Sequence, residues 1–238
     1  MRPAAAVVAL AALAGCASGP GADPRDPLEP WNRAVYKFND KVDQAVAQPV
    51  ARAYRRVVPG GIRDRVRNFF ANLADPFIGV NSFLQGKPED GITDWARFVF
   101  NSTFGLFGIH DVATEFGLEK HNEDFGQTFG RWGAGTGPYL VLPFLGSSNL
   151  RDGIGTAVDI YTDPLNYVEP ERAQYSLWAL RLTQTRADLL DASRILEEAS
   201  LDKYTFQRDA YLQRRRSLVY DGRPPRERLD YENDEKSR

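Results

Sequence analysis

Along most of the chain, apolar residues recur at steps of three and four, the spacing that places them on one face of an α-helix. The first such stretch begins at Pro30, a residue suited to the first turn of a helix. Its apolar positions, which we expect to be buried, are Trp31, Ala34, Val35, Phe38, Val42, Ala45 and Val46. The charged positions expected on the outside are Arg33, Lys37, Asp40 and Asp43. Pro49 interrupts the pattern, which continues over a short second helix to Val57.

The same spacing predicts three more helices before residue 170. One runs over residues 62–73, between the breakers Pro59-Gly60-Gly61 and Asp75-Pro76, and a short apolar turn over residues 77–84 follows it. A second begins at Pro88 and is expected to bury Ile92, Trp95, Ala96 and Val99. A third covers residues 150–161. Only residues 139–145 resemble a strand, and Pro143 argues against one there, so the predicted fold class is mainly α.

Residues 171–220 contain neither proline nor glycine. Apolar residues at helical spacing in this segment are Trp178, Leu182, Leu189, Ala192 and Leu196, with Arg181, Arg186, Asp188, Arg194 and Glu197 outside the stripe. An unbroken helix of this length would measure about 75 Å, whereas a compact domain of this size is about 45 Å across. We therefore expect the segment to bend or break near Ser200-Asp202, or to project from the domain. Residues 221–238 are charged, contain proline and are expected to form a disordered tail.

The chain starts with features of a lipoprotein signal peptide. Arg2 precedes an apolar stretch over residues 4–13, too short to span a membrane, which ends in Leu13-Ala14-Gly15-Cys16. This sequence is similar to the bacterial lipobox, in which a peptidase cuts before a cysteine that is then acylated. We interpret residues 1–15 as the signal peptide, Cys16 as the lipidation site and residues 16–28 as a tether rich in Gly, Pro and Asp. The alternative is an ordinary secretory signal with a chance cysteine.

Composition narrows the classes of function. The 30 basic and 32 acidic residues give a net charge of −2, which argues against a nucleic-acid partner. No stretch reaches the roughly 18 uninterrupted apolar residues of a spanning helix. A single cysteine excludes an intramolecular disulfide, and two histidines leave little room for a metal site. We therefore expect neither a metal nor a cofactor.

The middle of the chain is rich in phenylalanine and glycine. Twelve of the 14 phenylalanines lie between Phe69 and Phe144. Residues 101–109 are apolar, contain two glycines and carry no charge. Such a loop crosses a core, enters lipid or lines a passage. Composition alone favours the core, but an acyl anchor at Cys16 would favour lipid.

Several blocks of sequence occur in an order that is typical of one family. They are Asp26-Pro27-Leu28-Glu29-Pro30-Trp31-Asn32-Arg33, Tyr36-Lys37-Phe38-Asn39-Asp40, Asn68-Phe69-Phe70-Ala71-Asn72-Leu73, Leu84-Gln85-Gly86-Lys87-Pro88, Arg97-Phe98 with Asn101-Ser102-Thr103, Glu123-Asp124-Phe125-Gly126-Gln127-Thr128, Gly137 to Pro143, and Arg151-Asp152-Gly153. In these blocks the chain resembles the VacJ/MlaA family of outer-membrane phospholipid-transport lipoproteins. We take as signature residues Trp31, Asn32, Phe38, Asn39, Asp124, Phe125 and Gly126.

The resemblance implies one multi-helix, ring-like domain over residues 29–220, lying in the inner leaflet of a Gram-negative outer membrane and facing the periplasm. It implies a polar channel that takes misplaced phospholipid from the outer leaflet to a soluble periplasmic carrier, and association with a trimeric porin. It also maps the channel gate onto the loop that contains Asn101, Gly105, Leu106, Phe107 and Gly108. The family has no chemistry of its own, so the chain is not expected to be an enzyme. The main alternative is a scaffolding envelope lipoprotein without transport activity.

Other candidate sites carry weaker signals. Residues 133–137 lack the spacing and the preceding strand of a nucleotide loop, and we interpret them as a turn. His110-Asp111 and His121 with Asp124 could be a metal or acid–base pair, but ordinary polar histidines are favoured. A phospholipase would need a nucleophile, and no GxSxG motif occurs. Arg208 and the run Arg214 to Arg216 could face anionic headgroups or an acidic partner, although an exposed helix face is favoured.

Overall fold

The computed structural model describes residues 23–225 and confirms a mainly helical fold. Its elements in chain order are α2 (Glu29–Val42), a π-helical turn η1 (Asp43–Ala47), α3 (Gln48–Val57), α4 (Gly60–Leu84), α5 (Pro88–Thr103), α6 (Val112–Glu115), α7 (Phe125–Arg131), β1 (Tyr139–Leu142), β2 (Gly146–Asn149), α8 (Leu150–Thr162), a 3₁₀ turn η2 (Pro164–Tyr167), α9 (Glu171–Asp188), α10 (Leu190–Ala199) and α11 (Lys203–Val219). Cys16 and most of the predicted tail lie outside the described residues.

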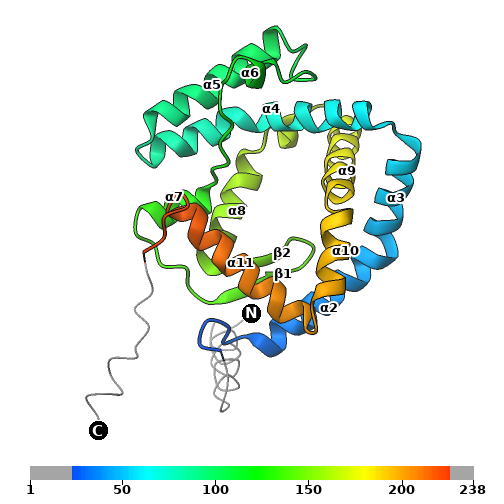
Figure 1. Cartoon of the computed structure of the whole chain (residues 1–238), viewed down its shortest axis with the longest axis vertical. Coiled ribbons are helices and arrows are strands. Elements are labelled where there is room, and N and C mark those ends of the chain that lie inside the picture. Colours follow the sequence, from blue (N-terminus) through cyan, green and yellow to red (C-terminus); the bar gives the residue numbers. More distant parts are fainter. Residues whose placement is uncertain (1–22, 226–238) are drawn as a thin grey trace.

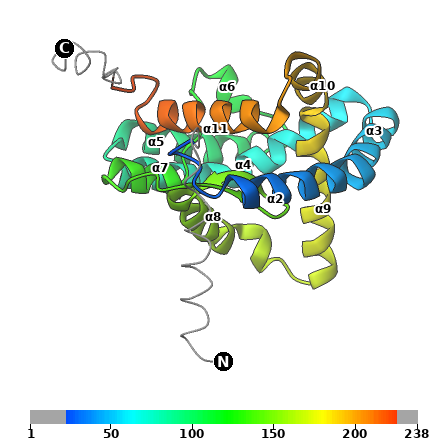
Figure 2. The same cartoon turned by 90° about the horizontal axis from the view of Figure 1, so that it is seen from below.

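The helices follow one another in the shape of a ring. In Figure 1, α4 closes the top of the ring, α3, α9 and α10 the right side, α2, the hairpin and α11 the bottom, and α7 and α8 the left. Figure 2 shows that the ring is flat, with α11 on one side of its layer, and α8 and the start of α9 extending on the other. Helices α5 and α6 lie on the outer side of α4.

The predicted end of the helix before Asp75-Pro76 was wrong. We predicted a break at Asp75-Pro76 and a turn over residues 77–84, but the helix continues through Pro76 to Leu84. Beyond the proline, α4 packs closely against α5: a Cβ on Gly79 would lie 2.4 Å from Trp95 Cδ1, and one on Gly91 would lie 2.9 Å from the Phe83 ring. Tertiary contacts therefore outweigh the missing hydrogen bond of one proline.

The faces of α2 and α5 are the reverse of those expected. On α5 the predicted core residues Ile92, Trp95 and Val99 are exposed, whereas the buried positions are polar or small: Gly91, Asp94, Arg97 and Asn101. On α2 only Asn32 and Val35 are buried, and most of the predicted apolar face lies outside. The helical period was correct, but the assumption that the apolar face turns inward was wrong.

A two-stranded antiparallel hairpin interrupts the helices, with Tyr139 opposite Asn149 and Leu142 opposite Gly146. The expectation of no strand here was wrong. Strand β1 ends directly before Pro143, so the proline lies in the turn, and β2 has no apolar alternation that the sequence could show.

The predicted break of the C-terminal helical segment is confirmed. Helix α10 ends at Ala199 and α11 begins at Lys203, with the side chain of Asp202 accepting from the N–H groups of Tyr204 and Thr205. A further break at Leu189 separates α9 from α10. These turns bend the segment around one side of the ring.

Candidate functional site

Among residues 23–225, most of the buried positions are polar, and many large apolar side chains are exposed. Within residues 23–225, 19 polar or charged residues are buried but only 11 apolar ones, while 32 large apolar residues are exposed. A protein surrounded by water shows the opposite distribution. The exterior is therefore suited to contact with an apolar phase.

The apolar loop between α5 and α6 is a strongly exposed part of this exterior. Phe104, Leu106 and Phe107 are 71%, 60% and 77% exposed. Leu106 and Phe107 both adopt left-handed backbone conformations, which turn the chain tightly and point it back toward α6. Of the three alternatives left by the sequence, the buried core turn is wrong.

The glycines of this loop pack closely against their surroundings. A Cβ on Gly105 would lie 2.1 Å from the carbonyl oxygen of His110, and one on Gly108 would lie 2.4 Å from Asn72 Cβ. The buried Asn101 amide donates to Asp111 and accepts from the N–H of Ala113. The loop lies on the outer side of α4 (Figure 1), so its assignment as the channel gate stays a prediction without support from its position.

Family-signature residues of α2 connect that helix to the hairpin. The buried Asn32 donates to Asp26 (2.7 Å) and to the carbonyl of Tyr139 (3.0 Å), and accepts from the N–H of Val141 (2.8 Å). Asn39 donates to the carbonyl of Leu142 and accepts from the N–H of Phe144. The other two signature residues here, Trp31 and Phe38, are half-exposed, and Phe38 packs edge-on against Phe144.

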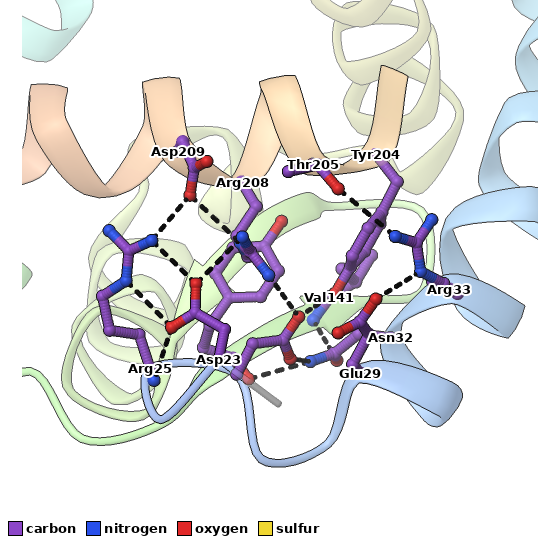
Figure 3. Close-up of polar contacts among 12 residues, drawn as sticks. Asp23, Arg25, Glu29, Asn32, Arg33, Val141, Tyr204, Thr205, Arg208 and Asp209 are labelled. Atoms are coloured by element: carbon purple, nitrogen blue, oxygen red, sulfur yellow. Dashed lines mark hydrogen bonds and ion pairs between the residues drawn. The ribbon is translucent and has the colours of Figure 1, made fainter. Parts of the chain in front are cut away.

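The segment directly before α2 is held by α11 (Figure 3). Arg208, only 6% exposed, pairs with Asp23 (2.9 Å) and Asp26 (3.4 Å), and the Tyr204 hydroxyl also donates to Asp26. Hydrogen bonds from Arg25 are the main cause that lowers the pKa of Asp23 to about 2. Residues 23–28, assigned to the tether by the sequence, are thus part of the packed ring. Arg208 was expected on an exposed helix face, and this prediction is wrong because its side chain is buried on α11.

A second ion cluster joins α7, α8 and α11. Arg215 Nη1 and Nη2 bind Asp124 (2.5 and 2.8 Å), and Nε binds Asp152 (2.8 Å). Burial opposes the charge of Arg215, but the two aspartates outweigh it and raise its pKa. A Cβ on the signature residue Gly126 would lie 2.7 Å from both Arg215 and Asp152, so only glycine fits there. Arg215 is therefore not on an exposed face either.

The α4–α5 pair encloses a third ionic cluster. The buried Asp75 bonds to Lys120, and Arg97 binds both oxygens of Asp111 (2.9 Å each). His121 lies 3.2 Å from Asp94 Oδ1 and 3.5 Å from Asp90, so it does not form the pair with Asp124 that the sequence analysis considered and did not favour. No three His, Cys, Asp or Glu side chains of residues 23–225 form a group that could hold a metal.

A cavity of about 270 Å³ lies between α4, α8 and α9; we call it the α4–α9 cavity. Its lining combines apolar side chains such as Phe77 with the polar Asn81, Asp159, Asp163 and Arg181, and Ala74 also borders it. Arg181 binds Asp163, whereas Asp159 accepts from the N–H of Phe125 at 3.3 Å. Burial is the main cause that raises the pKa of Asp159 to about 6, so an acid without a bonded cation among the described residues borders this cavity.

A second cavity, of about 210 Å³, lies at the opposite side of the ring; we call it the α2–α11 cavity. Asn39, Asp43, Arg186, Ser193 and Gln207 contribute to its lining. The signature residue Asn39 therefore both holds the hairpin and borders this cavity.

Sequence reasoning did not identify Asp159, and it did not predict that Arg215 pairs with Asp124 and Asp152. Arg215 and its partner Asp124 are 91 residues apart, and no local pattern marks such a pair.

Phe125, the remaining signature residue, is half-buried and packs against Phe129. No helix within residues 23–225 has both the length and the apolar composition needed to cross a bilayer.

The chain is similar to known proteins of one family. The family model described as MlaA lipoprotein matches residues 24–218. The intermembrane phospholipid transport system lipoprotein MlaA of Escherichia coli (strain K12) is 39% identical over 221 residues, which is 90% of this chain and 87% of that protein. The lipoprotein of the same description from Haemophilus influenzae is 30% identical and covers 92% of this chain and 90% of its own.

A solved structure described as "Structural basis for maintenance of bacterial outer membrane lipid asymmetry" has the same fold. It matches with a TM-score of 0.71 and 37% sequence identity, and the match covers 82% of this chain and 98% of the solved one. The resemblance found in the sequence blocks is confirmed over nearly the whole described ring.

Proposed function

The chain belongs to the MlaA lipoprotein family, and we propose that it removes mislocalised phospholipid from the outer leaflet of the outer membrane and thereby maintains lipid asymmetry. The E. coli relative is a lipoprotein of the intermembrane phospholipid transport system. In this proposal the protein lies on the periplasmic side of a Gram-negative outer membrane, anchored through acylated Cys16. It works beside a trimeric porin and passes lipid to a soluble periplasmic carrier.

The reversed distribution of polar and apolar residues carries the proposal. Exposed apolar side chains such as Phe104 and Phe107 can contact acyl chains. Polar side chains that line the two cavities, such as Arg186 and Arg181, can solvate a headgroup, which in hydrocarbon would lose its hydrogen bonds. A polar interior with an apolar exterior therefore lowers the barrier for a molecule that has both parts.

This role requires solvation and no bond chemistry. The buried ionic groups of the clusters described above are bonded to one another, as a supporting framework requires. We propose that the chain is not an enzyme and acts without a cofactor, with phospholipid and the bilayer as its immediate partners.

The test is to fill the interior without changing the exterior. Ala74 lines the α4–α9 cavity, and Val80 lies on the exposed face of the same helix. Ala74→Trp should leave outer-membrane localisation and porin co-purification intact but raise the level of phospholipid in the outer leaflet. Val80→Trp, the matched control, should keep that level at its wild-type value.

The scaffolding alternative gives a different result. A scaffold needs only the exterior, so Ala74→Trp would keep full function whenever the protein is folded and bound to its partner. Wild-type asymmetry in cells whose Ala74→Trp protein is shown to be folded and porin-bound would therefore contradict transport through this cavity.

A further inference from the structure

Four arginines from two sides converge on a pocket at the edge of the ring. The pocket has a volume of about 370 Å³ and lies between α3 and the junction of α9 with α10, which are neighbours in Figure 1. Arg52 and Arg55 come from α3, Arg186 from α9 and Arg194 from α10. We call it the arginine pocket.

Carboxylates compensate only half of this charge. Arg186 binds Asp43 through two bonds (2.6 and 2.8 Å), and Arg55 binds Asp191 at 3.1 Å. Arg52 donates to the amide oxygen of a glutamine, Gln48 (2.6 Å). Among the side chains that the structure describes, those of residues 23–196 and 200–225, no carboxylate is bonded to Arg52 or Arg194. Among these side chains, the four arginines and their two bonded aspartates leave a net charge of +2 at the pocket.

The start of α10 completes the pocket. Leu190, Asp191 and Ser193, at the first turn of α10, line it beside the arginines. Planar guanidinium groups match the oxygens of a phosphate in geometry and charge. The pocket is therefore complementary to a phosphate group.

Two features indicate a lipid phosphate. The arginine pocket shares Arg186 and Ser193 with the α2–α11 cavity, so it adjoins the polar interior of the ring. The exposed Ile195 (63%) lies one helical turn after the pocket residue Asp191 on α10, which places an apolar side chain on the same helix face. A phosphate with attached acyl chains would satisfy both the arginines and this apolar surface.

We propose that the arginine pocket binds the phosphodiester of an anionic phospholipid headgroup beside the ring interior. The inference rests on the proposed transport function, because it names the part of the lipid that this surface holds. A net charge of +2 favours a headgroup without an ammonium group over a zwitterionic one.

The experiment measures binding to the purified full chain in detergent. The probes are dihexanoyl phosphatidylglycerol, dihexanoyl phosphatidylcholine and inorganic phosphate, titrated by calorimetry. The test variant is Arg52→Gln with Arg194→Gln, which removes the two arginines without a bonded carboxylate. Arg56→Gln is the matched control, because Arg56 is exposed on α3 and does not line the pocket.

The wild-type protein should bind phosphatidylglycerol at least tenfold more tightly than phosphatidylcholine. The double variant should lose at least tenfold in affinity for phosphatidylglycerol, and Arg56→Gln should retain it. Equal binding by wild type and double variant would overturn the site. Binding of inorganic phosphate as tight as that of phosphatidylglycerol would assign the pocket to free phosphate and overturn the lipid ligand.

A cellular measurement separates this inference from the proposed function. If the wild-type chain maintains outer-leaflet asymmetry but binds no phosphatidylglycerol in the pocket, the pocket proposal fails and transport stands. If the wild-type chain binds the lipid through the pocket but does not maintain asymmetry, the transport function fails and the site stands.

Discussion

Replacing Asp159 by asparagine should make the protein more stable at neutral pH. The side chain is buried beside the α4–α9 cavity and has no bonded cation among the described residues. Burial raises its pKa from 3.8 to about 6, so the folded protein holds the proton more tightly than the unfolded chain does. Ionising this carboxyl above pH 6 therefore lowers the free energy of unfolding by about 3 kcal/mol at most.

The sign of the pH dependence follows from the direction of the shift. Between pH 4 and pH 6 the folded state binds more protons at Asp159 than the unfolded state, so this contribution to stability falls as pH rises. Asparagine has no titration and can still accept the N–H of Phe125. The difference in stability between Asp159→Asn and wild type should be close to zero near pH 4 and reach its full value near pH 7.

The assay is thermal unfolding in detergent, followed by circular dichroism at several pH values. For a chain of this length, a gain of about 3 kcal/mol corresponds to a rise in Tm of roughly 6–12 °C. Asp163→Asn is the control from the same cavity: it removes the carboxylate bonded to Arg181 and should lower Tm at pH 7. A difference for Asp159→Asn that does not change between pH 4 and pH 7 would show that the carboxyl is solvated, and would refute the reasoning.

Three further predictions concern the framework, the exterior and the anchor. Arg215→Ala removes the cation bonded to Asp124 and one of the two arginines bonded to the buried Asp152, and should lower the free energy of unfolding by about 3–5 kcal/mol, measured by chemical denaturation. The neighbouring exposed Arg214→Ala should change it by less than about 0.5 kcal/mol. Phe107→Asp should leave the Tm of the protein in detergent unchanged but weaken its association with vesicles about tenfold or more in a flotation assay. The control is Leu201→Asp, at the exposed turn before α11, which tests whether a new charge at any exposed position has the same effect. Cys16→Ser should prevent acylation, and recovery of that variant in the outer-membrane fraction would contradict the proposed anchor.

The sequence was a good guide to where helices begin and end. Proline and glycine mark the start of α4, and the turn at Ser200-Asp202 was predicted because an unbroken helix would exceed the size of the domain. Pro76 was misleading for a physical reason: the close approach of α5 at Gly79 supplies more stabilisation than one missing hydrogen bond removes. Such a contact joins two helices and leaves no trace in local periodicity.

The direction of each face and the ionic site could not be predicted in the same way. A period of 3.6 separates apolar from polar positions, but it does not say which phase surrounds the protein. On α5 the surrounding phase reverses the assignment of Ile92 and Arg97. The clusters around Arg215 depend on partners from three separate helices, so only the fold brings them together.

The bonds that hold Asp23 and Asp26 to α11 also limit how far the ring can travel. An acylated Cys16 would be seven residues from Asp23, a distance of about 24 Å when fully extended. This reach is shorter than the roughly 30 Å hydrocarbon core of a bilayer. The anchored ring would therefore meet lipids and partners by diffusing along the membrane surface. The short tether would keep its effective concentration at that surface far above its average concentration in the periplasm. Lengthening residues 17–22 would dilute these encounters without touching a single contact of the ring.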